Sequence, residues 1–372
     1  MKLTPLGRLS WRRALGLLAV ASLALVPAAS AAEGTCGITG VPRVVAVGDI
    51  HASYDNLLKV LTMAGLLDAS AHWAGGRAFY VQVGDMLDRG VQARPVLDLL
   101  MRLEKEARKA GGRVVVLLGN HEVMNMLGDL RYVQAAEYEE WKEPDTARFQ
   151  TPPGKTRRMR FVEAVTRRAR EEAKAAGQPF DEEAYRQKIL DQTPPGFVER
   201  VQALSASGEY GQWLREHDVV ATVNGVAFVH GGLTPEVAAL GCEGINRKVR
   251  SELGPDLAQT RANPREALAT GESGPLWYRG LAQEDEATLL PSVERVLQSM
   301  KVKAVVIGHT PTGDGKIRPR FEGRVVMIDV GMTAEYGGHL AALELGPDGS
   351  FSAIYPTGRE SLERKAADTA NR

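Results

Sequence analysis

A repeated pattern most constrains what this chain can fold into: short apolar runs, each followed at once by a polar motif that contains glycine. Runs of β-branched character at 41–48, 79–83 and 114–118 alternate with segments of helical apolar spacing, one from about Ser53 and one over 91–110. This alternation predicts a mainly parallel sheet covered by helices. Because ligands bind at the carboxyl ends of strands in such sheets, we expect the polar motifs to meet at one rim.

Sheet character returns in the second half of the chain. The strands predicted there are 219–223, 226–229, 302–307, 325–328, 340–345 and 351–355. Asn224-Gly225 is a strong signal for a two-residue hairpin turn, and Pro347-Asp348-Gly349 indicates a second turn. Between these strands, residues 243–275 are polar and rich in turn-forming residues.

The motifs supply groups that bind divalent metal ions. They are Gly48-Asp49-Ile50-His51, Gly84-Asp85-Met86-Leu87-Asp88-Arg89-Gly90, Gly119-Asn120-His121-Glu122, Val229-His230-Gly231-Gly232 and Gly308-His309-Thr310. Carboxylate, carboxamide and imidazole ligands together suit Mn²⁺, with Fe or Zn²⁺ as alternatives, rather than copper or an iron–sulfur cluster. One carboxylate can bridge two cations about 3.5–4 Å apart, the spacing of two-metal hydrolases of phosphate esters. Each motif alone fits an ordinary turn or helix cap, but their joint occurrence predicts a two-metal centre.

In their order and spacing, these motifs resemble the phosphoprotein phosphatase branch of the calcineurin-like metallophosphoesterase superfamily. Segments 124–132 and 274–280 look more specifically like the Shewanella-like bacterial protein phosphatases. The resemblance covers roughly 43–346, and it covers 135–215 poorly. It implies an α/β fold, a four-layer α-β-β-α sandwich of two mixed sheets, with a helical insertion.

The resemblance also implies a role for each motif residue. It gives the first metal the ligands Asp49, His51 and Asp85, and the second metal Asp85, Asn120, His230 and His309. The reaction it implies is direct attack on phosphorus by a hydroxide that bridges the two ions. His121 would be the general acid on the leaving oxygen, held by Asp88. Arg89 would be a phosphate clamp, and Arg279 is our candidate for a second one.

The chain departs from the family pattern at two positions. Ala52 stands where glycine is usual after the first histidine motif. Gly308-His309-Thr310-Pro311 lacks the second histidine found two residues later in many phosphodiesterases of the superfamily. The second departure favours phosphomonoesters, and with the resemblance it predicts a phosphoprotein (Ser/Thr or Tyr) phosphatase.

Two other functions stay open at this point. One is a dinucleoside polyphosphate hydrolase or broad nucleotide phosphatase, against which Glu122 and His230-Gly231-Gly232 favour the phosphatase branch. The other is a metal-binding module without catalysis. The intact His121, Asp88 and Arg89 argue against that module, because a chain that only bound metal would not need them.

The N-terminus has the three parts of a secretory signal peptide over residues 1–31: a basic start, an apolar run over 14–26 and the small residues Ala29-Ser30-Ala31. The run is shorter than the roughly 20 residues of a membrane span, although an uncleaved anchor is an alternative. Secreted or periplasmic location is therefore expected. There Cys36 and Cys242 could pair, or stay as two buried thiols.

The remaining chain is expected to be one metallophosphatase domain over 41–356. It is interrupted by a helical insertion at 130–216, either a solvated outgrowth or a cap over the active site, and followed by a polar tail at 357–372. Removing the four basic residues of the signal peptide leaves 42 basic and 46 acidic residues, a net charge of −4. This balance argues against nucleic acid as a partner and leaves phosphorylated proteins or small phosphomonoesters as the expected substrates.

Overall fold

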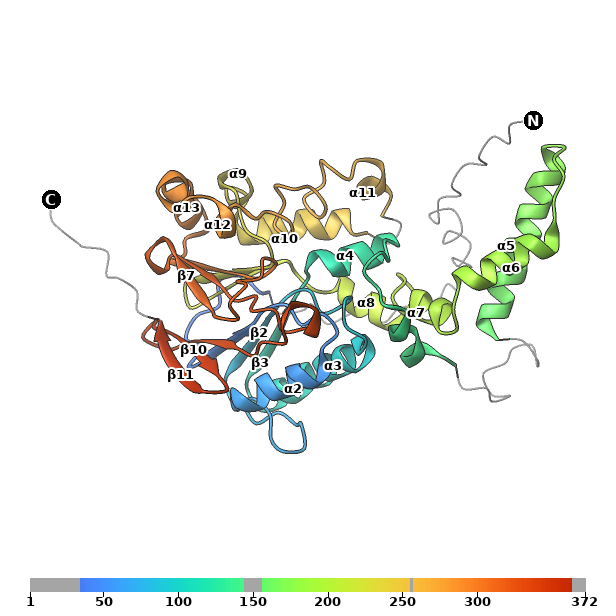
Figure 1. Ribbon diagram of the computed structural model, residues 1–372. Helices are drawn as coiled ribbons and strands as arrows, with labels where there is room; N and C mark the ends of the chain where they lie inside the picture. Colours follow the sequence, from blue (N-terminus) through green and yellow to red (C-terminus); the bar gives the residue numbers. More distant parts are fainter. Residues whose placement is uncertain (1–33, 144–155, 255–256, 363–372) are drawn as a thin grey trace.

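The computed structural model describes residues 34–143, 156–254 and 257–362 (Figure 1). Two sheets face each other, and helices cover the outer face of each, so the layers follow the order helix, sheet, sheet, helix. The predicted signal peptide, 1–31, lies outside the described residues. Within the described ranges, no helix has both the length and the apolar character that crossing a bilayer requires.

The first sheet has the strand order β11-β10-β9-β1-β2-β3. Its strands are β1 (Val44–Val47), β2 (Phe79–Val83), β3 (Arg113–Leu117), β9 (Ala342–Leu345), β10 (Phe351–Tyr355) and β11 (Gly358–Leu362). Helices α2 (Tyr54–Met63) and α3 (Ala93–Lys109) connect the parallel strands β1, β2 and β3, as the sequence predicts. Strands β9, β10 and β11 add an antiparallel half, so the sheet is mixed.

The second sheet has the strand order β4-β5-β6-β8-β7 and is also mixed. Its strands are β4 (Val220–Val223), β5 (Val226–Val229), β6 (Ala304–Ile307), β7 (Arg318–Arg320) and β8 (Val325–Met327). The turn between β4 and β5 has positive φ at both Asn224 (50°) and Gly225 (74°), the geometry that the Asn-Gly signal predicts. The helices after β5 are α9 (Pro235–Ala238), α10 (Gly241–Glu252), α11 (Ala258–Ala262), α12 (Gly280–Gln283) and α13 (Glu286–Met300). The region at 243–275 therefore begins inside a helix rather than in turns.

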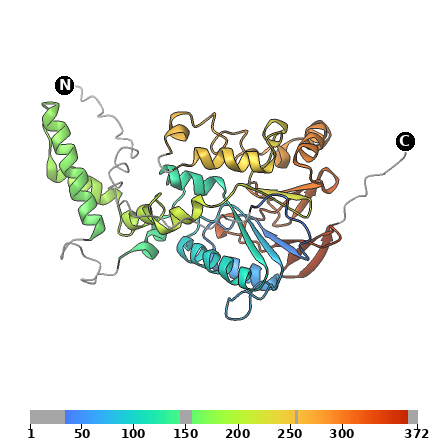
Figure 2. The ribbon, with the colours of Figure 1, turned by 180° about the vertical axis from the view of Figure 1, so that it is seen from behind.

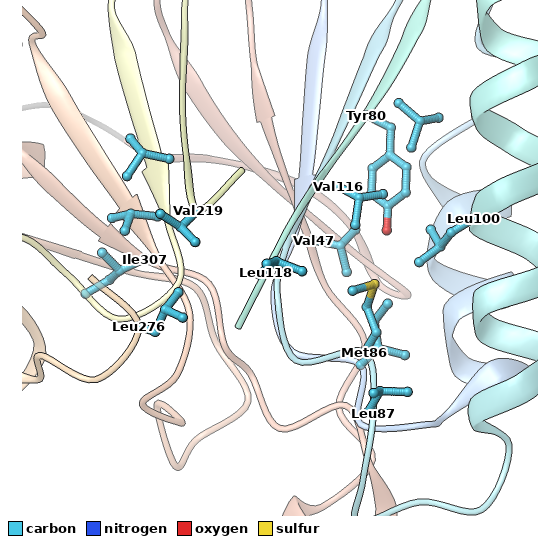
Figure 3. Packing of buried hydrophobic residues seen from close by; sticks show 14 of the residues in the cluster. Val47, Tyr80, Met86, Leu87, Leu100, Val116, Leu118, Val219, Leu276 and Ile307 are labelled. Atoms are coloured by element: carbon cyan, nitrogen blue, oxygen red, sulfur yellow. The ribbon is translucent and has the colours of Figure 1, made fainter. Parts of the chain in front are cut away.

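The central strands are buried on both faces, which explains their continuous apolar runs. In β1, Val44 and Ala46 belong to the core between the two sheets, whereas Val45 and Val47 belong to the core under the helices. Figure 3 shows part of the second core, where Tyr80 and Val116 point from neighbouring strands toward Leu100 of α3. Each sheet is thus held between two apolar layers, and its strand ends form a rigid rim.

The insertion is helical, as predicted, but most of it stands away from the sheets. Its elements are η2 (Ala135–Trp141), α5 (Arg157–Ala175), α6 (Glu182–Gln192), α7 (Phe197–Ala203) and α8 (Glu209–Arg215). Helices α5 and α6 project away from the sandwich in both views (Figures 1 and 2). They share a small core of their own with η2 and α7, in which Phe161, Ile189 and Phe197 are buried. Among its described residues, Tyr132 contacts Arg89 and Arg200 contacts Asp88, both in the polar motif after β2.

Regular structure continues into the predicted polar tail, 357–372. Gly358–Leu362 forms β11 and pairs antiparallel with β10. An unpaired β10 would present a free sheet edge, and this short polar strand covers it. The rest of the predicted polar tail, 363–372, lies outside the described residues.

A disulfide joins Cys36 to Cys242 across 206 residues of chain. It attaches the segment before β1 to helix α10, on the outer side of the second sheet. Of the two possibilities that the sequence leaves open, the structure therefore contains the bond rather than the thiols.

Candidate metal centre and active site

The predicted ligands converge at the carboxyl ends of strands from both sheets. Asp49 follows β1, Asp85 follows β2, His230 follows β5 and His309 follows β6, while Asn120 begins helix α4 (Asn120–Leu127) directly after β3. All of them are buried, as is His51. Because the two sheets each supply ligands, the site lies at the seam of the sandwich.

The first group of ligands surrounds His51. Its Nδ1 lies 3.1 Å from the carbonyl oxygen of Leu87, which can only accept, so Nδ1 carries the proton. Its Nε2 faces two carboxylates, with Asp85 Oδ2 at 3.7 Å and Asp49 Oδ2 at 3.9 Å. Burial lowers the pKa of His51 to about 4, so the imidazole is neutral at neutral pH. A neutral imidazole with a free Nε2 is the form that binds a metal ion.

The second group surrounds His230. Its Nδ1 donates to the carbonyl of Val83 at 2.8 Å. Its Nε2 lies 2.9 Å from Asn120 Oδ1, 3.1 Å from His309 Nδ1 and 3.3 Å from Asp85 Oδ2. Burial disfavours a positive charge on His230, but the Asp85 carboxylate outweighs it and raises the pKa of His230. The surroundings of His230 therefore favour a cation.

The donor set fits two divalent ions. Asp85 Oδ2 reaches both groups, as a bridging carboxylate must. Burial lowers the pKa of His309 to about 2, and its buried Nε2 has no hydrogen-bond partner among the described residues. Burial and the neighbouring carboxylates Asp329 and Asp85 raise the pKa of Asp49, a repulsion that a cation would relieve.

The backbone around Asp85 is held in an unusual conformation. Asp85, His51 and His309 all have positive φ values, 47°, 47° and 65°. Non-glycine residues with positive φ are strained and are typical of functional sites. Glu122 holds the Asp85 loop by accepting backbone N–H bonds at 2.7–3.2 Å, from Gly119, Asp85, Met86 and Leu87. A Cβ on Gly119 would lie 2.2 Å from Asp85 Oδ1, which explains why this motif needs a glycine.

His121 and Asp88 form a buried pair beside the ligands. His121 Nδ1 lies 2.7 Å from Asp88 Oδ2, and its Nε2 lies 3.8 Å from Asp85 Oδ2. Burial disfavours a charge on His121, but Asp85 and Asp88 outweigh it and raise the pKa to about 9. His51, Asp85 and His121 are also close enough together to hold one ion, so proximity alone does not separate a ligand role for His121 from a general-acid role. Its short bond to Asp88 is the arrangement expected of a proton donor.

The two predicted phosphate clamps both border the site. Arg89 lies between the rings of Tyr132 (4.4 Å) and Tyr336 (5.1 Å), and it pairs with Glu335 at 2.6 Å. Arg279 donates to the carbonyl oxygen of His309 at 2.8 Å. The structure thus brings both arginines to the rim, and their contact with phosphate stays a prediction.

Sequence reasoning missed several residues at this site. Asp329 follows β8, is buried and hydrogen-bonds Asp49; burial raises its pKa to about 6. It comes after an apolar run, as the predicted ligands do, so the same strand-end pattern could have found it. Tyr132 ends the segment 124–132 that resembles the Shewanella-like phosphatases, but the sequence assigned it no role. Arg200 on α7 carries no such signal, because it lies in a polar segment without strand periodicity.

Similarity to known sequences agrees with this geometry. The profile of the calcineurin-like phosphoesterase family matches residues 42–313. An uncharacterised protein of Schizosaccharomyces pombe is 33% identical over 324 residues, which cover 84% of this chain and 80% of that protein. Shewanella-like protein phosphatase 2 of Arabidopsis thaliana is 31% identical over 294 residues, which cover 78% of this chain and 71% of that protein.

Solved structures agree as well. A cold-active protein tyrosine phosphatase superposes with a TM-score of 0.65 at 27% identity, covering 88% of this chain and 80% of that chain. The cold-active protein-tyrosine phosphatase of a psychrophilic Shewanella species gives 0.64 at 26% identity, covering 88% and 82%. The resemblance inferred from the motifs and the fold that it implied are confirmed.

Proposed function

We propose that this chain, which belongs to the calcineurin-like phosphoesterase family, is an exported phosphomonoesterase that acts on phosphoproteins. That it is a metal-dependent phosphatase of the Shewanella-like type follows from its relatives and from its two ligand groups. The observation that carries the proposal is the placement of Asp85. Its carboxylate lies between the two ligand groups and near His121, so the metal-bound hydroxide and the proton donor would both reach one phosphoryl group, from opposite sides.

We assign the roles as follows. The ligands are Asp49, His51 and Asp85 for one ion and Asp85, Asn120, His230 and His309 for the other. Two divalent ions, Mn²⁺ first and Fe or Zn²⁺ as alternatives, would lower the pKa of a shared water and neutralise charge on the phosphoryl oxygens. His121 protonates the leaving oxygen while Asp88 holds its Nδ1. Arg89 and Arg279 bind the phosphoryl oxygens.

Phosphotyrosine is the substrate that we propose first. The rings of Tyr132 and Tyr336 flank Arg89, so an aryl leaving group would meet aromatic walls at the rim. Two structures similar to this chain are named as protein tyrosine phosphatases, which supports the same choice. A monoester is favoured because no second histidine follows His309 by two residues.

Export is supported by two features that lie apart in the sequence. Residues 1–31 have the pattern of a signal peptide. Cys36 and Cys242 form a disulfide, and such bonds persist in oxidising compartments such as the periplasm or the exterior. A secreted or periplasmic enzyme would meet phosphorylated proteins or small phosphomonoesters there.

A rate comparison on the mature chain, residues 32–372 with Mn²⁺, tests the proposal. The substrates are a phosphotyrosine peptide, the matching phosphoserine peptide, a dinucleoside polyphosphate and bis-4-nitrophenyl phosphate. We expect the highest kcat/KM for phosphotyrosine and the lowest for the diester. A higher value for the dinucleotide would favour the nucleotide hydrolase instead, and no hydrolysis of any substrate would favour the metal-binding module.

A further inference from the structure

Arg200 of helix α7 is a buried arginine that the proposed chemistry does not yet use. Its side chain is 0% exposed, and its guanidinium has a partner on each side. Nε donates to Glu137 Oε1 at 2.6 Å, Nη1 donates to Asn125 Oδ1 at 2.7 Å, and Nη2 lies 3.5 Å from Asp88 Oδ1. Burying a guanidinium is costly unless it is well paired, so this position demands an arginine rather than merely tolerating one.

The contacts of Arg200 lead step by step to His121. Because Arg200 donates to Asn125 Oδ1, the amide group of Asn125 must point its Nδ2 the other way. That Nδ2 donates to Asp88 Oδ1 at 2.9 Å and to the carbonyl oxygen of His121 at 2.9 Å. The second oxygen of Asp88 is then left for His121 Nδ1 at 2.7 Å. Hydrogen bonds therefore fix the orientation of each side chain from Arg200 through Asn125 and Asp88 to His121.

We propose that Arg200 is a positioning residue for leaving-group protonation, and that it acts on His121 through Asn125 and Asp88. The proposal rests on the proposed function, because it assumes that His121 donates a proton to the leaving oxygen. Without Arg200, the amide of Asn125 can turn over and Asp88 loses a bond that fixes its carboxylate plane. The imidazole ring of His121 would then stay in its pocket, but the Asp88 carboxylate would no longer fix the orientation of that ring.

This assignment gives the insertion a role other than that of a cap. Arg200 and Glu137 both belong to the segment 130–216, whereas Asn125 and Asp88 belong to the metallophosphatase core. Glu137 is fully buried and balances the charge of Arg200. The insertion thus supplies a paired cation to the back of the His121–Asp88 pair. The contacts of Arg200 with Glu137, Asn125 and Asp88 use no side chain of α5 or α6.

The test compares two aryl phosphates that differ in leaving group, phenyl phosphate and 4-nitrophenyl phosphate, with the Mn²⁺-loaded full chain. In Arg200→Met we expect kcat for phenyl phosphate to fall about tenfold to hundredfold, the scale of a misplaced catalytic group. The 4-nitrophenyl rate should fall less than about threefold, because that leaving group needs little protonation. Equal losses for both substrates, or no loss for either, would overturn the proposal.

A matched control separates this effect from damage to the insertion. Arg158 on α5 donates to the carbonyl oxygen of Leu190 and does not reach the catalytic rim. Arg158→Met should therefore leave the ratio of the two rates unchanged. If Arg200→Met fails to fold, Arg200→Met combined with Glu137→Gln avoids an unpaired buried carboxylate and should show the same change in ratio.

A second readout does not depend on turnover. In the chain loaded with diamagnetic Zn²⁺ in place of Mn²⁺, the Nδ1 proton of His121, shared with Asp88, should give a downfield, slowly exchanging proton NMR signal in the wild type and in Arg158→Met. The signal should broaden or vanish in Arg200→Met. Its persistence would contradict the positioning role, whereas a wild-type chain that shows this signal but hydrolyses neither phosphate would count against the proposed function alone.

Discussion

The disulfide between Cys36 and Cys242 allows a quantitative test of how the second sheet is secured. The change is the double replacement of both cysteines by alanine. The native contacts of the attached segment should survive it, because Thr35 Oγ1 donates to the carbonyl oxygen of Val220 at 3.1 Å and the Ile38 amide donates to that of Thr222 at 3.0 Å. The lost stability would then come mainly from the unfolded chain, which is no longer cross-linked.

The size of the effect follows from the length of the loop that the bond closes. With a sequence separation of 206 between the cysteines, the chain-entropy relation gives about 18 cal/mol/K, or about 5 kcal/mol at 25 °C. Segments of the chain between the two cysteines include β1 to β5 and the whole insertion, so the constraint acts on more than half of the molecule.

Urea unfolding of the wild-type and double-variant chains measures this difference. The midpoint should fall, and the free energy of unfolding should drop by about 5 kcal/mol. Thiol titration of the denatured, non-reduced wild type should find no free thiol. A drop below about 2 kcal/mol, or two titratable thiols in the wild type, would refute the reasoning.

Three further predictions concern the catalytic rim. Asp85→Asn should abolish activity and weaken the binding of both ions, because one carboxylate serves both ligand groups. If elemental analysis finds two full equivalents of metal per chain in the variant, the bridging role is excluded. His121→Ala should retain metal but lose about 10²–10⁴ in rate, less for 4-nitrophenyl than for alkyl phosphates, and equal losses would exclude the general-acid role. Replacing residues 144–192 with a Gly/Ser linker should keep 4-nitrophenyl phosphate hydrolysis within about tenfold and leave the ranking of phosphopeptides unchanged, because α5 and α6 project away from the sandwich. A changed ranking would restore the cap hypothesis.

Much of the sandwich and of the ligand set could be predicted because the signals are local. Strands such as β5 and β6 read as apolar throughout, since apolar layers lie on both of their faces. The ligand that follows each strand is marked by its neighbouring glycine. Helix α10 was missed because its polar outer face, with residues such as Arg247 and Lys248, resembles a solvated turn region.

Features that depend on distant pairings could not be predicted from the residues alone. Nothing in the run 342–345 indicates that it pairs with β1, about three hundred residues earlier. Likewise the bonds of Arg200 to Asn125 and Asp88 depend on how the insertion folds back, which no local pattern records.

Ala52, noted for replacing a glycine, adopts φ 52°, so the turn keeps its left-handed form with a residue that is strained there.

The seam position of the ligands ties metal supply to the folding of the whole chain. The second ligand group takes Asp85 and Asn120 from the first sheet and His230 and His309 from the second, so that group is complete only after the sheets have docked. An ion that binds the docked state and not its parts stabilises it by mass action, by about 2.7 kcal/mol at a hundredfold excess over Kd. Chelation would therefore loosen the sandwich as well as stop catalysis, and metal scarcity would lower the stability of the fold together with the activity.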